Sequence, residues 1–290
     1  MKTRLDEALR MIQKSGKTVD EKKSMCIKLG LRPRDVEYLE FQGFFRGVEL
    51  TFGVEIECDV NRGRVEGAAL PGFAFAYEGY NHTDNRTYFK FVRDGSVRGD
   101  DPIECVSPIL DNNDTGLATL KACCDTLNAA GARVNVSCGL HVHVGAQGLK
   151  GYQIVNVYKN YQAMEGLIDS FMSPSRRGDC RWAKSLSGFN FNHCDNAEDV
   201  ASALSYDRYR KVNPMSFERH GTIEFRQHQG TTDFEKISMW VSFCCELVEW
   251  SRDNVLSGQV SRVEDIPFLD EPEKAFFKAR KAYFDNLQSR

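Results

Sequence analysis

The feature that most constrains the fold of this chain is an alternation of ionic and apolar side chains. In residues 221–228 (Gly-Thr-Ile-Glu-Phe-Arg-Gln-His), a spacing of two places Glu224, Arg226 and His228 in one row of an extended strand. The apolar residues between them form the opposite row. A sheet normally turns its apolar face to the core and leaves scattered polar residues outside, so acid, guanidinium and imidazole in one line are unusual.

Three other segments repeat this pattern, within residues 51–59, 102–108 and 140–144. Their ionic positions are Glu55, Glu57, Asp59, Glu104, His141 and His143. If these strands share a sheet, one of its faces collects four glutamates, three histidines and an arginine. Such a face suits metal and polyanion binding better than it suits solubility.

The composition gives no global attraction to nucleic acid or to an anionic membrane. Of the 290 residues, 41% are hydrophobic and 27% are charged, and the formal net charge is -3. No apolar run approaches the length of a membrane span, and the first residues lack the apolar core of a secretory signal. We therefore expect a cytoplasmic protein with no membrane partner and no nucleic-acid partner.

The ten cysteines occur as adjacent pairs and singletons, and none of them forms a Cys-x-x-Cys pair. This placement fits small buried hydrophobic residues in a reducing compartment better than it fits a disulfide framework or a zinc knuckle. We interpret all ten as structural.

Residues 1–46 differ from the rest, because 11 lysines or arginines stand against 7 acids. Apolar residues at helical spacing predict one helix around Leu5 and Ile12, a second from Asp20 and a third from Pro33. We interpret this part as a helical arm or small subdomain that could contact a protein partner or select the substrate. A nucleic-acid module is the weaker alternative, since the basic residues of this segment are mixed with acidic ones.

Residues 47–290 predict one catalytic domain of the α+β class. Expected strands lie at 51–59 and 87–93 and near Glu104, Val134 and His141; expected helices lie at 114–130, 151–171, near Ala197, at 234–250 and at 271–287; a hairpin turns at His220-Gly221. Helices would cover one face of a mainly antiparallel sheet, and the ionic residues would occupy the other face.

Each ionic pattern also has a purely structural interpretation. Two glutamates at alternate strand positions lie roughly 7 Å apart and suit Mg²⁺, yet such pairs are usually solvated. A His-x-His pair binds metals or phosphoryl oxygens but is more often structural. A Glu-x-Arg pair suits a phosphoryl group, although it could be a cross-strand salt bridge.

Their joint occurrence opposite apolar rows predicts a site. Hard metal ions, arginine and imidazole in one cavity suggest phosphoryl transfer from a nucleotide. The sequence contains no P-loop, Rossmann glycine turn or kinase loop, so the nucleotide is expected to bind on the sheet itself.

Five motifs follow one another between about residues 50 and 250: Gly53-Val-Glu-Ile-Glu57, Asp94-Gly-Ser96 with Glu104-Cys-Val-Ser-Pro108, Cys138-Gly-Leu-His-Val-His-Val144, Arg208-Tyr-Arg-Lys-Val-Asn213, and Thr222-Ile-Glu-Phe-Arg226 with Gly230-Thr231. Together they resemble the amidoligase family, which belongs to the carboxylate–amine ligases related to glutamine synthetase and glutamate–cysteine ligase. The resemblance implies a curved, mainly antiparallel sheet of the type found in those synthetases.

The resemblance also implies ATP and Mg²⁺ or Mn²⁺ as cofactors and assigns roles to residues. The implied metal ligands are Glu55, Glu57, Glu104, His141 and Glu224; His141, His143 and Arg226 would contact nucleotide or phosphate; Arg226, Glu57 and His143 would act in catalysis. Looser matches, with a solvated basic loop as the alternative, are Arg177, Arg181, Lys184, Arg208 and Arg210. Thr222 stands where the synthetases carry another arginine, so His228 or Arg181 would have to supply that contact.

The implied reaction is ATP-dependent formation of an amide or isopeptide bond through an acyl phosphate. The carboxylate and the amine stay open, and an amino acid, a polyamine, a peptide or a protein could supply either. A lid formed by residues 61–86 or 174–188 is expected to shield the intermediate. The alternatives are a small-molecule kinase, a metallohydrolase and a non-catalytic module that binds a nucleotide or peptide.

Overall fold

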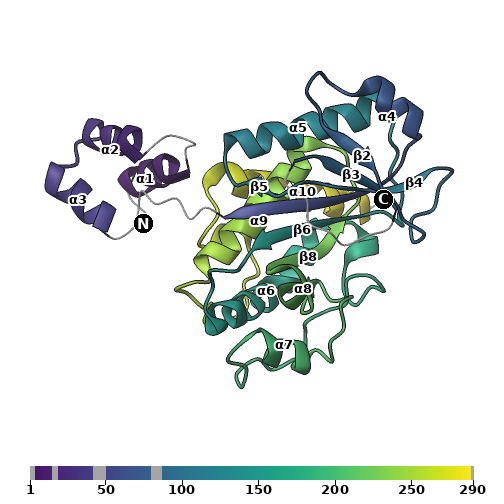
Figure 1. Cartoon of the computed structure of the whole chain (residues 1–290). Coiled ribbons are helices and arrows are strands. Elements are labelled where there is room, and N and C mark those ends of the chain that lie inside the picture. The colour runs from purple at the N-terminus through teal and green to yellow at the C-terminus, as the bar shows by residue number, and fades with distance from the viewer. Residues whose placement is uncertain (1–3, 15–18, 42–49, 80–86, 289–290) are drawn as a thin grey trace.

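The computed structural model describes residues 4–14, 19–41, 50–79 and 87–288, and it has the predicted α+β class (Figure 1). Its centre is an open, mostly antiparallel sheet of eight strands in the order β2-β3-β4-β1-β6-β8-β7, with β5 also paired to β1. Among the strands of the described residues, only β2 and β3 pair in parallel. The strands are β1 (Thr51–Asp59), β2 (Phe75–Tyr77), β3 (Phe89–Arg93), β4 (Pro102–Val106), β5 (Leu110–Asp111), β6 (Gly139–Gly145), β7 (Val212–Asn213) and β8 (Thr222–Gln229).

The predicted helices are present with small shifts of their ends, and two further short helices, at Arg62–Ala68 and Ser216–His220, were not predicted. The helices are α1 (Arg4–Lys14), α2 (Val19–Lys28), α3 (Pro33–Phe41), α4 (Arg62–Ala68), α5 (Asp114–Ala129), α6 (Gly151–Phe171), α7 (Ala197–Ala203), α8 (Ser216–His220), α9 (Phe234–Trp250) and α10 (Glu271–Gln288). None of the described helices combines the length and the apolar character that a membrane crossing requires.

The main core lies between the sheet and the helices α5, α6 and α9. The apolar row of β1 (Phe52, Val54, Ile56) is at most 2% exposed and belongs to the same buried cluster as Trp240 of α9. Each such side chain contributes roughly 1.5–3 kcal/mol by leaving water. The apolar face of the sheet is thus the one that the helices cover, and its ionic face is left for the site.

The first three helices have an apolar cluster of their own, formed by Ile12, Cys26 and Val36. They are the purple group in Figure 1. The predicted helices of this part are confirmed, and Pro33 opens the third as expected. Its role, and its separation as a domain, stay predictions.

Two local predictions were wrong. The strand expected near Val134 is a single bridge between Arg133 and Asp59, because the Asn135 side chain accepts hydrogen bonds from Ser137 and turns the chain. The turn expected at His220-Gly221 is the end of α8, which connects β7 to β8. Gly221 caps this helix with φ 64°, a left-handed conformation that glycine adopts without strain.

All ten cysteines are free thiols, as predicted; nine are buried and Cys180 is half-buried. In the first predicted lid segment, the chain forms α4 and β2, and residues 80–86 lie outside the described part of the chain.

Candidate functional site

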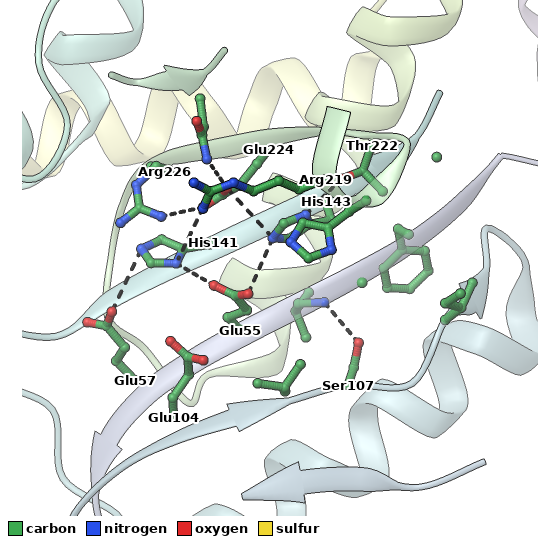
Figure 2. Close-up of a pocket in the computed structure, with 18 of the residues that line it drawn as sticks. Glu55, Glu57, Glu104, Ser107, His141, His143, Arg219, Thr222, Glu224 and Arg226 are labelled. Atoms are coloured by element: carbon green, nitrogen blue, oxygen red, sulfur yellow. Dashed lines mark hydrogen bonds and ion pairs between the residues drawn. The ribbon is translucent and has the colours of Figure 1, made fainter. Parts of the chain in front are cut away.

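The strand register brings the ionic side chains of the sheet into facing pairs. The pairs are Glu57 with Glu104 across β1 and β4, Glu55 with His141 across β1 and β6, and His143 with Glu224 across β6 and β8. Directly opposed residues of antiparallel strands have Cβ atoms roughly 4.5–5.5 Å apart, so these pairs form one continuous cluster (Figure 2).

Two histidines connect the carboxylates of this cluster. His141 Nδ1 lies 2.7 Å from Glu55 Oε2, and its Nε2 lies 3.8 Å from Glu57 Oε1. His143 Nε2 lies 3.4 Å from the other oxygen of Glu55. Glu224 receives hydrogen bonds from Arg226 and from Asn213 of β7.

Three overlapping groups of three side chains place their ligand atoms within 4.8 Å of one another. The groups are Glu55 with Glu104 and His141, Glu55 with His143 and Glu224, and Glu57 with Asp94 and Glu104. Carboxylate oxygens with one or two imidazoles suit hard divalent cations such as Mg²⁺ and Mn²⁺. The cluster can therefore hold metal ions, and it contains every metal ligand that the sequence suggested.

Asp94 is a ligand candidate that the sequence interpretation missed as a metal residue. It follows β3 directly and precedes Gly95, and an Asp-Gly pair after a strand is typical of a turn rather than of a metal ligand. Its place beside Glu57 and Glu104 depends on the pairing of β3 with β4, which is not visible from spacing within one segment.

The carboxylates of the cluster differ in their proton affinity. Burial alone would raise the pKa of Glu55, but hydrogen bonds from His141 and His143 hold that pKa well below its ordinary value. Burial, together with the charges of Glu55 and Glu57, raises the pKa of Glu104 well above its ordinary value. Two opposed carboxylates repel each other, and a bound metal ion relieves such repulsion.

A cavity of about 710 Å³ opens over this ionic face. Its size is typical of a small-molecule or cofactor site. The predicted residues that line it are Glu55, Glu57, Glu104, His141, His143, Arg208, Glu224 and Arg226. Among the described residues, the buried Nε atoms of Arg208 and Arg226 have no hydrogen-bond partner, and both side chains line the cavity.

Four of the loosely matched basic residues do not line the cavity, so their predicted contact with a cofactor lacks geometric support. Arg177 donates to the Met172 carbonyl and lies over the Phe284 ring. Lys184 and Arg210 both pair with Asp207, and Arg181 lies over the Trp182 ring.

Arg176 takes the place expected of its neighbour Arg177. Its guanidinium is buried, lines the cavity and donates to the Cys138 carbonyl at 2.7 Å. Gly139 makes room for it, since a Cβ there would stand 3.2 Å from the guanidinium. Spacing alone could not decide which of two adjacent arginines in a loop turns inward.

His228 is the clearest correction to the predicted site. His228 pairs with Leu140 and Phe225 pairs with Val142, so Arg226 and Gln227 both stand opposite the single His141. This β-bulge moves the following side chains to the other face of the sheet. The His228 ring accordingly packs 5.7 Å from the Trp240 ring of α9, and burial lowers its pKa to about 3.

Neither candidate for the missing arginine contact reaches the cavity, since His228 faces the helices and Arg181 lies outside the lining. Thr222 itself is engaged by His143 at 2.9 Å and by Ser216 at 2.8 Å. Arg219 of α8 lines the cavity and extends over the ionic face in Figure 2. Among the described residues it has no carboxylate partner.

A family model with the description "Putative amidoligase enzyme" matches residues 48–248, which is more than half of the chain. The match confirms the resemblance that the five motifs indicated, and the first three helices lie outside it. No curated protein matches the chain.

Proposed function

The chain belongs to the amidoligase family, and we propose that it is an ATP-dependent carboxylate–amine ligase that forms an amide or isopeptide bond through an acyl phosphate. The family match indicates a ligase. The dependence on ATP, the acyl-phosphate intermediate and the likeness of the sheet to that of glutamine synthetase are proposed.

The observation that carries the proposal is the combination of three metal-ligand groups with Arg226 in one cavity. A carboxylate group and a nucleotide polyphosphate are both anionic, so a site that joins them must neutralise several charges at once. The donor set fits Mg²⁺ or Mn²⁺, which when bound would offset the charge of the phosphoryl oxygens.

In the first step, a carboxylate oxygen of the substrate attacks the γ-phosphorus, the bond to the β-phosphate oxygen breaks, and ADP leaves. Arg226 is held in place by Glu224 and is proposed to contact the transferring phosphoryl group. We assign to Arg219 the second cationic contact, in place of the arginine that Thr222 replaces.

In the second step, the amine nitrogen attacks the acyl carbon, the carbon–oxygen bond to phosphate breaks, and the nitrogen releases a proton. His143 faces the cavity and is held by the Thr222 hydroxyl, which fits its proposed role beside the phosphate. Residues 174–188 supply Arg176 and Trp182 to the lining, and we keep this loop as the proposed shield of the acyl phosphate from water.

The test is ATP turnover by the purified protein with Mg²⁺ against amino acids, polyamines and short peptides, with ADP and product mass followed in parallel. We expect an amide product that Glu57→Ala abolishes. Glu66→Ala is the matched control, since Glu66 is exposed on α4 and pairs only with Arg62 among described residues. A stable phosphorylated product would favour a kinase, and nucleotide binding without turnover would favour a binding module.

A further inference from the structure

Two aromatic rings line the cavity beside its arginines. Trp182 lies in the loop before α7, and Tyr209 lies just before β7. Their ring centroids are 5.4 Å apart with an interplanar angle of 69°, so the two rings form a corner. Neither the indole N–H nor the tyrosine hydroxyl has a hydrogen-bond partner within the described chain, and both rings are half-buried.

Two backbone hydrogen bonds fix the position of this corner. The Lys184 N–H donates to the Tyr209 carbonyl at 2.7 Å, and the Lys211 N–H donates to the Lys184 carbonyl at 2.9 Å. The segment that carries Trp182 is thereby fixed to the edge of the sheet. Arg181 lies 4.4 Å over the indole ring and does not itself line the cavity, so it supports the ring from outside the lining.

Cations connect this corner to the metal-ligand groups. The Tyr209 ring centroid lies 5.6 Å from the Arg208 guanidinium carbon and 5.9 Å from that of Arg226. Arg226 in turn pairs with Glu224, a member of one metal-ligand group. The guanidinium groups of Arg208 and Arg226 therefore form a cationic path from the corner to the carboxylates.

We propose that Trp182 and Tyr209, with Arg208 beside them, bind the purine base of the nucleoside triphosphate. The phosphates then extend past Arg226 toward the carboxylates. This inference rests on the proposed function. A flat π-face stacks on aromatic rings, and a chain of phosphates needs a cationic path; the corner offers both in this order.

The experiment compares two probes that share a triphosphate arm and differ by the nucleoside: the magnesium complexes of the imido analogue of ATP and of tripolyphosphate. Binding is measured by calorimetry and by tryptophan fluorescence in the full chain. Trp182→Ala should weaken binding of the ATP analogue at least about fivefold and leave tripolyphosphate binding unchanged. Trp182→Phe should keep most of the affinity but lose the fluorescence change.

Trp250→Phe is the matched control, because Trp250 is half-buried against Phe268 and does not line the cavity. It should preserve binding of both probes and the fluorescence change. The inference is overturned if Trp182→Ala weakens both probes equally, since the ring then shapes the phosphate path, or if it weakens neither. Failure of the wild-type protein to bind either probe overturns the proposed function itself, and the inference with it.

Discussion

Mild acidification should destabilise the wild-type protein more than it destabilises a His228→Gln variant. Burial holds the pKa of His228 at about 3, against an ordinary value of 6.5. Above pH 6.5 the ring is neutral in both the folded and the unfolded chain. As the pH falls from 6.5 toward 3, the unfolded chain binds a proton that the folded chain does not, so the folded state loses stability.

At pH 5 this difference amounts to about 2 kcal/mol, because each pKa unit between folded and unfolded states is worth roughly 1.4 kcal/mol. Urea unfolding followed by circular dichroism at pH 7 and pH 5 measures the change in the free energy of unfolding. The wild-type protein should lose about 2 kcal/mol more than His228→Gln. His193→Gln replaces an exposed histidine and should behave as the wild type does.

The sign of this difference tests the β-bulge directly. A histidine on the ionic face would stand among glutamates, and acidification would then strengthen its interactions in the folded state. A wild-type protein that loses less stability than His228→Gln between pH 7 and pH 5 would refute the assignment of His228 to the face that the helices cover.

Three further predictions concern other parts of the chain. Lys211 is fully buried between Glu165 and Asp169, so Lys211→Met should lower the free energy of unfolding by roughly 3–5 kcal/mol, measured in urea; a smaller loss would mean that the two acids find other partners. Arg219→Gln should lower kcat roughly a hundredfold if Arg219 contacts the transferring phosphoryl group, and an unchanged kcat would exclude that contact. Removal of residues 1–46 should leave magnesium tripolyphosphate binding intact and impair only a protein substrate or partner, which pull-down and turnover assays with both substrate types would detect.

The sequence predicted those parts of the site that depend on strand alternation. On β1 and β6 the period of two holds without interruption, so Glu55, Glu57, His141 and His143 face the cavity as expected. The apolar row of β1 meets the helices for the same reason. Here the local pattern and the packing of the whole domain agree, and the prediction of one from the other succeeds.

The other parts of the site depend on strand register and on contacts between distant segments, which the local alternation of side chains does not reveal. The bulge in β8 is one extra residue, and nothing in the run from Glu224 to His228 marks where the alternation stops. The inward turn of Arg176 depends on space over Gly139, which lies far away in the sequence. Arg219 is not recognisable as a site residue in the sequence, because the segment before Gly221 predicts a hairpin turn, whereas it forms a short helix whose Arg219 and His220 line the cavity.

On the ionic face, the carboxylates that would bind a cation also repel one another and lower the stability of the metal-free protein. The variant Glu104→Gln tests both effects. Glu104 lies opposite Glu57 and belongs to two of the three metal-ligand groups. With divalent cations removed by a chelator, the neutral amide relieves repulsion between carboxylates, so the variant should melt at a higher temperature than the wild type.

Added Mn²⁺ should reverse this order. A ligand that binds only the folded state at a hundred times its Kd stabilises that state by about 2.7 kcal/mol, and the variant lacks the negative charge of the side chain that two of the groups share. The two melting temperatures should therefore cross as Mn²⁺ is titrated, while Glu66→Gln follows the wild type throughout. Parallel curves for Glu104→Gln and the wild type would mean that these carboxylates do not hold the ion, and the charge repulsion on this face would then need another partner.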